Sequence, residues 1–314
     1  MRLKMVQDCS MDEMISKDYD LAFFCSSFET RCTTIPKELE SNSTLIKKTI
    51  ILGHASDSEE LPDQRRVKND TYFEQHWTSE VLETKSTDYV CIFKILNEHF
   101  NKEKGMSLFI DYTAMSRIWL SSILTWLKHN DVLGEVTVDF AYSIGANYKS
   151  APQYTVKNFF CLPGYEGKLN IQKKSTAIIG LGFDKYSPLW VFDNLEPDET
   201  YIFIASPAIK EDYVEVVKNN NKMLIEASQN APLELSIRSV EDSFKRLSEL
   251  ISSQVDSSNI TFVPMGPKPF SLTTLLVILR FEEVACMNIV RNKHEVRNDV
   301  LPSGEFISTR ITFK

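Results

Sequence analysis

Residues 108–127, LFIDYTAMSRIWLSSILTWL, constrain the fold of this chain more than any other stretch. They begin as an apolar strand, continue through a polar turn at residues 111–117, and run into an apolar helix from Ile118. The first N–H groups of a helix have no partner within it, and together with the helix dipole they favour an anion. Arg117 adds donors that suit phosphate or carboxylate. The stretch therefore predicts a strand–turn–helix unit whose turn binds an anion.

Similar units recur along the chain. Short apolar runs predict strands at residues 21–25, 49–52, 136–144, 176–179, 201–205, 233–237, 260–263 and 284–290. Helical spacing of apolar residues predicts helices at residues 87–100, 240–251 and 272–281. Continuous apolar strands that alternate with helices are typical of mainly parallel sheets covered by helices. We interpret residues 53–70 as a loop with some helix, and the C-terminal tail as a hairpin.

The two halves of the chain repeat this pattern. FFCSSFE at residues 23–29 aligns with IIGLGFD at 178–184, the stretch 107–127 aligns with 259–279, and 136–144 aligns with 284–292. Unrelated α/β units also share such patterns, so duplication is an interpretation. We predict an α/β chain of two tandem Rossmann-like units with mainly parallel sheets, a pseudo-dimer in one chain. The expected boundaries are 1–150 for the first unit, 151–174 for a linker and 175–314 for the second unit.

Polar residues follow several predicted strands. Parallel sheets bind ligands at the carboxyl ends of their strands, so we treat these residues as candidates for ligand binding. The candidates are Ser26, Ser27, Glu29, Arg31, Asp111, Thr113, Ser116, Arg117, Gly266 and Lys268.

Each candidate also has a structural alternative. Arg117 clamps a phosphate or pairs with Asp111, and Asp111 orients a ribose hydroxyl or caps the helix. Ser27 and Glu29 are able to cap a helix together. Prolines that flank Gly266 and Lys268 stiffen that turn.

Composition narrows the range of functions. The 314 residues carry a formal net charge of -8, which argues against broad nucleic-acid binding, because such binding needs a basic face. The six cysteines form no C-x-x-C pair and no metal-site spacing. No apolar run is long enough to cross a membrane, and the first residues lack the apolar core of a signal peptide. We therefore expect a cytoplasmic protein with no membrane partner, no cofactor and no metal.

Motifs of known catalytic classes are missing from the sequence. No P-loop, kinase set, H-E-x-x-H or nucleophile elbow is present, and Gly180 and Gly182 lack the third glycine of a dinucleotide fingerprint. The five histidines are scattered, and none is close in sequence to Cys25 or Cys32. We therefore name no catalytic residue. The basic cluster Arg65, Arg66 and Lys68 is interpreted as a solvated loop or as a lid over a phosphate.

The turn DYTAMSR resembles the D-x-T-G-G-T-K turn of CARF domains, the Rossmann-like sensors of CRISPR systems. Asp111 and Thr113 match, Ser116 stands for threonine and Arg117 for lysine, while Ala114 and Met115 replace the two glycines. Residues 265–269, MGPKP, look like a second, degenerate copy. A chain with two such units is similar to the SAVED domains of bacterial anti-phage signalling. The resemblance implies binding of a cyclic oligonucleotide and a response through an effector.

We therefore expect a ligand-binding sensor or accessory protein for a nucleotide-like anion, in a bacterial defence or signalling system, that acts through a protein effector or complex partner. One alternative is an enzyme that cleaves or modifies a nucleotide at the same site, with Asp111 and Glu29 as acid and base. Another is a structural subunit of a defence complex with a vestigial pocket. The replaced glycines favour the structural subunit, and a pocket filled by Tyr112, Met115 and Met265 would support it.

Overall fold

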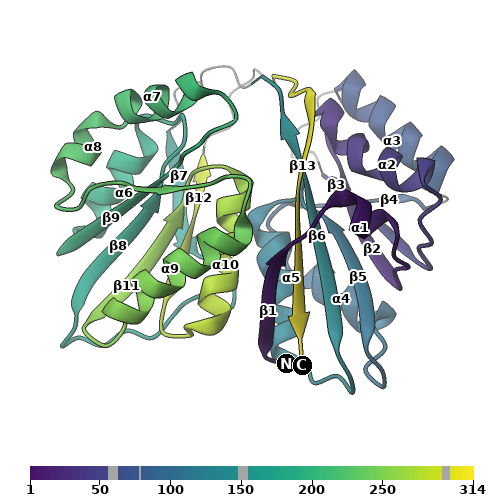
Figure 1. Ribbon diagram of the computed structural model, residues 1–314, viewed down its shortest axis with the longest axis horizontal. Helices are drawn as coiled ribbons and strands as arrows, with labels where there is room; N and C mark the ends of the chain where they lie inside the picture. The colour runs from purple at the N-terminus through teal and green to yellow at the C-terminus, as the bar shows by residue number, and fades with distance from the viewer. Residues whose placement is uncertain (56–62, 78, 148–154, 292–297) are drawn as a thin grey trace. The chain divides into compact units, whose positions relative to one another are not determined.

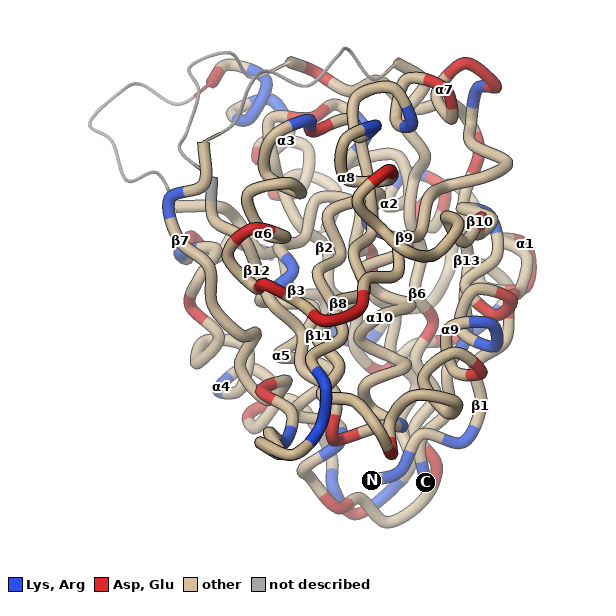
Figure 2. Tube along the Cα trace, turned by 90° about the vertical axis from the view of Figure 1, so that its left-hand side faces the viewer, with Lys and Arg blue, Asp and Glu red and all other residues tan. Residues whose placement is uncertain are grey.

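A computed structural model describes residues 1–55, 63–77, 79–147, 155–291 and 298–314 (Figure 1). The chain divides into two compact units, Met1–Tyr148 with Arg297–Lys314, and Lys149–Val296. Each unit has one sheet of mostly parallel strands interleaved with helices, so the predicted fold class is confirmed. None of the helices described here combines the length and apolar character of a membrane span. Acidic and basic residues are interspersed along the described chain (Figure 2).

The first unit contains a seven-stranded sheet. Its strands, in sheet order, are β1 (Leu3–Asp8), β13 (Pro302–Phe313), β6 (Val136–Gly145), β5 (Met106–Asp111), β2 (Leu21–Ser26), β3 (Thr49–His54) and β4 (Val81–Thr84). The five strands from β6 to β4 run parallel, whereas β13 is antiparallel to both β6 and β1. The helices are α1 (Met11–Ile15), η1 (Thr30–Thr33, a 3₁₀ turn), α2 (Thr34–Ser41), α3 (Gln64–Trp77), α4 (Val90–His99) and α5 (Arg117–His129).

The apolar runs of the sequence form buried strands and helices, as their patterns predict. Every residue of β2 is buried, as expected for a strand that is covered on both faces. Helix α5 buries all ten residues from Ile118 to Leu127, so it lies in the interior and not at the surface. The strand–turn–helix unit at residues 108–127 is therefore the centre of the first unit.

The second unit contains a six-stranded sheet. Its strands, in sheet order, are β10 (Leu233–Leu235), β9 (Glu199–Ala205), β8 (Lys174–Gly180), β11 (Ser258–Pro264), β12 (Ala285–Arg291) and β7 (Val156–Cys161). Strands β10 to β12 run parallel, and β7 is antiparallel to β12. The helices are α6 (Ser187–Leu195), α7 (Glu211–Asn220), α8 (Lys222–Ala227), α9 (Val240–Gln254) and α10 (Lys268–Arg280).

Both sheets have the same topology. If the five parallel strands of each unit are numbered in chain order, both sheets read 3-2-1-4-5. The aligned sequence segments correspond to equivalent strands: β2 to β8, β5 to β11 and β6 to β12. Each sheet also has an antiparallel strand beside its fifth parallel strand. That strand is β13 in the first unit and β7 in the second.

These two antiparallel strands correct the expected boundaries. Residues 151–174, expected as a linker, include β7, which belongs to the second sheet. The tail, expected as a hairpin within a second unit of residues 175–314, is the single strand β13, which lies between β6 and β1 in the first sheet. Each unit thus receives its antiparallel strand from the chain that follows the other unit's fifth parallel strand. Hydrogen bonds between distant segments of the chain decide which sheet β7 and β13 join. Local sequence patterns do not predict these bonds.

A buried carboxylate fixes β13 in the first sheet. Asp139 of β6 is fully buried and accepts hydrogen bonds from Arg310 Nε at 2.7 Å and Arg310 Nη2 at 2.8 Å. The Tyr19 hydroxyl donates to its Oδ2 at 2.8 Å, and Lys17 Nζ lies 3.2 Å from the same oxygen. Four donors thus surround one carboxylate, which satisfies a charge that would otherwise be costly to bury.

We predict that Asp139→Asn lowers the free energy of unfolding by about 3 kcal/mol, because the Arg310 guanidinium loses its buried counter-charge. Urea denaturation monitored by far-UV circular dichroism measures the change. Lys47→Met is the control, because Lys47 pairs with Asp20 at 2.7 Å but is 61% exposed; this variant should unfold like the wild type. Equal effects of the two substitutions would contradict the role given to Asp139.

Alkaline pH should weaken the same cluster. Burial, reinforced by the charge of Asp139, raises the pKa of Tyr19 well above its usual value. The folded state therefore holds a proton that the unfolded chain releases above about pH 10. Stability contributed by neutral Tyr19 is present below that pH and falls above it by about 1.4 kcal/mol per pH unit. In Tyr19→Phe, the free energy of unfolding should fall less steeply with pH above pH 10 than in the wild type. An unchanged slope would contradict the role given to Tyr19.

Candidate functional site

The candidate site of the first unit lies where the strand order reverses. Strand β2 comes first in the parallel set, β3 lies on one side of it, and β5 lies on the other. Open α/β sheets bind ligands at the carboxyl ends of the strands at this point. Eight of the ten candidate residues lie at the last positions of β2 and β5 or in the segments that follow these strands.

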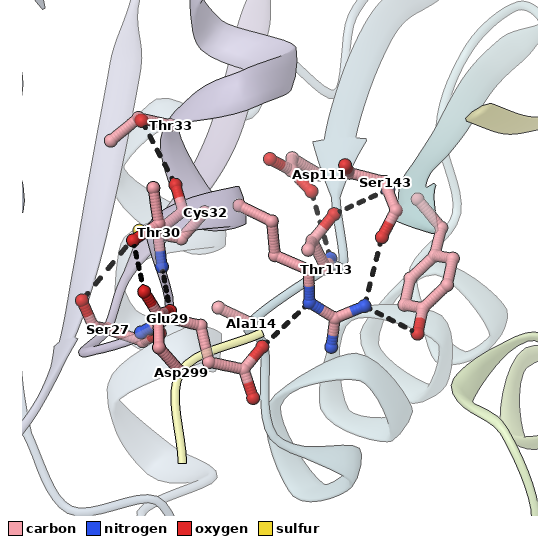
Figure 3. A network of polar contacts seen from close by, with 12 residues as sticks. Ser27, Glu29, Thr30, Cys32, Thr33, Asp111, Thr113, Ala114, Ser143 and Asp299 are labelled. Atoms are coloured by element: carbon pink, nitrogen blue, oxygen red, sulfur yellow. Dashed lines mark hydrogen bonds and ion pairs between the residues drawn. The ribbon is translucent and has the colours of Figure 1, made fainter. Parts of the chain in front are cut away.

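Arg31 makes more side-chain contacts in the site than its neighbours do, and Figure 3 shows the polar network around Glu29, Thr113 and Ser143. The Arg31 side chain is 4% exposed. Its Nε donates to Glu29 at 2.8 Å, and its Nη1 donates to the Tyr142 hydroxyl at 2.9 Å and to the Ser143 carbonyl at 3.0 Å. The guanidinium carbon also lies 5.2 Å from the centre of the Tyr142 ring. Arg31 therefore connects the segment after β2 to the end of β6.

Helix α3 supports the segment after β2. Asn69 Nδ2 donates to the Ser27 carbonyl at 2.8 Å, and the Ser26 hydroxyl donates to Asp70 at 2.6 Å. The Ser27 hydroxyl accepts the Glu29 N–H at 3.0 Å. Ser27 thus closes a turn with Glu29, and Glu29 pairs with Arg31. Ser27 and Glu29 therefore do not cap a helix together, which was the structural alternative predicted from the sequence.

The segment after β5 joins the same network. Asp111 Oδ1 accepts the Thr113 N–H at 2.9 Å, and the Thr113 hydroxyl accepts the Ser143 N–H at 2.9 Å. The cap of α5 is Ser116, whose hydroxyl accepts the Trp119 N–H at 3.1 Å. Asp111 therefore stabilises the turn, and Ser116 begins the helix. Arg117 is the first residue of α5 and is half-buried.

Two hydroxyls in this region are buried and have no hydrogen-bond partner among the described residues. They belong to Tyr112, directly after β5, and to Ser143, at the end of β6. The Tyr112 ring stacks on Tyr142 at 5.3 Å, and burial raises the pKa of Tyr112 well above its usual value. A buried polar group without a partner is costly. These two hydroxyls are therefore a local cost to stability within the network.

His54 is a site residue that the sequence analysis missed. It ends β3, its ring stacks on Trp119 at 4.6 Å, and its Nε2 lies 3.0 Å from the Ala114 carbonyl and 3.6 Å from Cys25 Sγ. A carbonyl only accepts, so Nε2 carries the proton and cannot also take one from the thiol. His54 thus anchors the turn after β5. Only the alignment of parallel strands brings it to Cys25, 29 positions away in the chain.

The basic cluster lies at the start of a helix, and not in a loop. Arg65 and Arg66 belong to α3. Arg66 is buried, pairs with Asp70 and Glu83, and donates to the His54 carbonyl at 3.2 Å. Arg65 pairs with Asp63, and only Lys68 of the three is fully exposed. Two of the three residues therefore stabilise α3 and its contact with β3.

The equivalent point of the second unit is closed. The loops after β8 and β11 meet directly, because the Met265 N–H donates to the Gly180 carbonyl at 2.9 Å. Leu181 and Met265 are buried there. A Cβ on Gly266 would lie 2.7 Å from the Leu181 carbonyl oxygen, so the glycine allows the loops to touch. Lys268 is the first residue of α10 and is half-buried. The structure thus places Gly266 and Lys268 in a different unit from the other eight candidates.

We predict that Gly266→Ala destabilises the protein by about 2 kcal/mol, because the added methyl group forces the two loops apart. Gly182→Ala is the matched comparison. Its added Cβ would lie 3.1 Å from the Met265 carbonyl, a milder contact. Differential scanning fluorimetry should therefore give a larger fall in melting temperature for the Gly266 variant. Equal melting temperatures would show that the loops separate easily.

Comparisons with known proteins do not identify a family. No protein-family model matches the sequence, and no curated protein matches it. Among solved structures, the cytoplasmic domain of a prokaryotic cation chloride cotransporter aligns with 87% of this chain and 96% of its own length. Its TM-score is 0.24 and its sequence identity 10%. The likeness is too weak to carry an argument about fold or function.

Proposed function

We propose that the first unit binds a nucleotide-like anion where its strand order reverses, and that the protein is a sensor or accessory protein that acts through a partner protein. The observation that carries the proposal is the convergence of the segments after β2 and β5 at this point.

The charges at this point favour an anion. Helix α5 begins there, and its dipole places partial positive charge at its first turn. Arg117 occupies that turn, and the Arg31 guanidinium lies behind the segment after β2. A nucleotide combines phosphates for these groups with a sugar and base for polar and aromatic contacts. A cyclic oligonucleotide and a defence setting are the finer proposal, and they rest on the resemblance of residues 111–117 to the CARF turn.

The second unit plays a different role in this proposal. Its equivalent point is closed by contact between the loops that contain Gly182 and Gly266. We therefore place the ligand in the first unit alone.

A structural subunit is the second candidate, and one observation favours it. Tyr112, Met115 and Met265 are 1%, 2% and 6% exposed, so the side chains expected to fill a vestigial pocket are all buried. Cleavage of a nucleotide has less support. Glu29 accepts from Arg31, and Asp111 accepts from the Thr113 N–H, so both proposed acid/base groups serve the network.

The test is thermal unfolding with a panel of cyclic and linear oligonucleotides. A ligand at one hundred times its Kd should stabilise the wild type by about 2.7 kcal/mol. Arg117→Ala should lose most of that shift, because the phosphate loses its charge partner. Lys268→Ala is the matched control, because Lys268 is the first residue of the equivalent helix; its shift should equal that of the wild type.

Each other outcome has a distinct meaning. If Lys268→Ala also loses the shift, both units bind the ligand and the restriction to the first unit is wrong. If no oligonucleotide shifts the wild type, the anion proposal is wrong and the structural subunit is the function to pursue. Mass spectrometry of the same samples detects any product and would reveal an enzyme.

A further inference from the structure

The segment that leads into β13 holds the loop that carries Arg31. Asp299 Oδ1 accepts the Thr30 N–H at 2.8 Å, and its Oδ2 accepts the Thr30 hydroxyl at 2.6 Å (Figure 3). Both oxygens of one carboxylate thus engage the residue next to Arg31. Thr30 lies 269 positions away from Asp299, and the chain between them includes the whole second unit.

The attachment of Asp299 is separate from that of the main part of β13. Between Pro302 and Phe306 the pairing with β6 shifts register, and within this interval Gly304 has φ of 87° with open space around it. Beyond the shift, Arg310 is bound to buried Asp139. Before it, Asp299 is half-buried, and the Leu301 carbonyl accepts the Ala146 N–H at 2.8 Å. The leading segment therefore has the weaker attachment of the two, and a flexible position separates them.

The segment that Asp299 holds contains Arg31 and Cys32, and both side chains are buried. The Arg31 guanidinium is bound to Glu29, Tyr142 and Ser143. An incoming anion reaches this guanidinium only if the loop moves. The energy that opposes the movement includes the two hydrogen bonds to Asp299, which are charge-assisted.

We propose that Asp299 is a latch that holds the segment at residues 27–33, which includes Arg31, against the end of β6, and that its release makes the Arg31 guanidinium accessible to an anion. The ligand part of this inference rests on the proposed function. By linkage, an anion that binds the open loop favours release of Asp299 to the same extent.

Alkylation of Cys32 measures the opening without any ligand. Burial raises the pKa of the Cys32 thiol to about 12, so iodoacetamide at pH 8 modifies it mainly when the loop is open. Asp299→Ala should raise the rate at Cys32 roughly tenfold, because two charge-assisted hydrogen bonds no longer oppose opening. Peptide mapping by mass spectrometry assigns the rate to each cysteine. Cys286 in β12 is also fully buried and serves as the internal control.

Three variants separate the latch from general destabilisation. Asn298→Ala removes the exposed neighbour of Asp299 and should leave the Cys32 rate unchanged. Thr30→Val removes only the hydroxyl and should give a smaller increase than Asp299→Ala, whereas Thr30→Ser should behave like the wild type. If Asp299→Ala accelerates Cys32 and Cys286 equally, the substitution unfolds the protein and the latch is wrong. An unchanged Cys32 rate overturns the latch as well.

The ligand test is independent of the alkylation result. For any oligonucleotide that shifts the wild type, Asp299→Ala should bind several-fold more tightly in titration calorimetry, because it no longer has to open the latch. Unchanged or weaker binding, with faster alkylation, would show that the loop opens without controlling the site. Faster alkylation with no oligonucleotide bound would leave the latch in place and refute the nucleotide proposal.

Discussion

The candidate site depends on one buried guanidinium. Arg31 joins the segment after β2 to the end of β6, and Ser143 at that end also receives the turn after β5 through Thr113. Three segments that are far apart in the chain thus meet at Ser143, whose carbonyl accepts from Arg31 and whose N–H donates to Thr113. A buried cation of this kind needs all its partners, since the loss of one leaves charge without compensation. The planar fork of arginine provides several donors at once, which a lysine cannot reproduce.

The two units show how one topology supports two different outcomes. Both sheets reverse their strand order at the same point, where a ligand site is expected. In the first unit polar side chains occupy that point, and two hydroxyls there are unsatisfied. In the second unit the two loops touch through Gly182 and Gly266, with Leu181 and Met265 buried between the strand ends. The difference arises from a few loop residues, because the strands and helices around them are equivalent.

The sequence predicted the central strands of the sheets better than the strands at their edges. Continuous apolar runs and helical spacing identified the central strands and α5, because burial on both faces leaves a strong pattern. Strand β1 and the start of α3 were missed, since an edge strand and a charged, half-exposed helix carry little periodicity. Among the site residues, Asp111, Thr113 and Arg31 do lie together. His54 was missed because it reaches Cys25 only through the alignment of β2 and β3.

The sequence by itself determined the central strands of both sheets, helix α5 and their order along the chain, because these follow from hydrophobic periodicity and chain position. Tertiary structure alone decided which sheet receives β7 and β13, because each pairs through backbone hydrogen bonds with strands that are far away in the chain. It also decided that Arg31 lies in a closed network and that Asp299 holds the adjacent loop. Such contacts join residues up to 269 positions apart, and only the folded chain brings them within hydrogen-bonding distance.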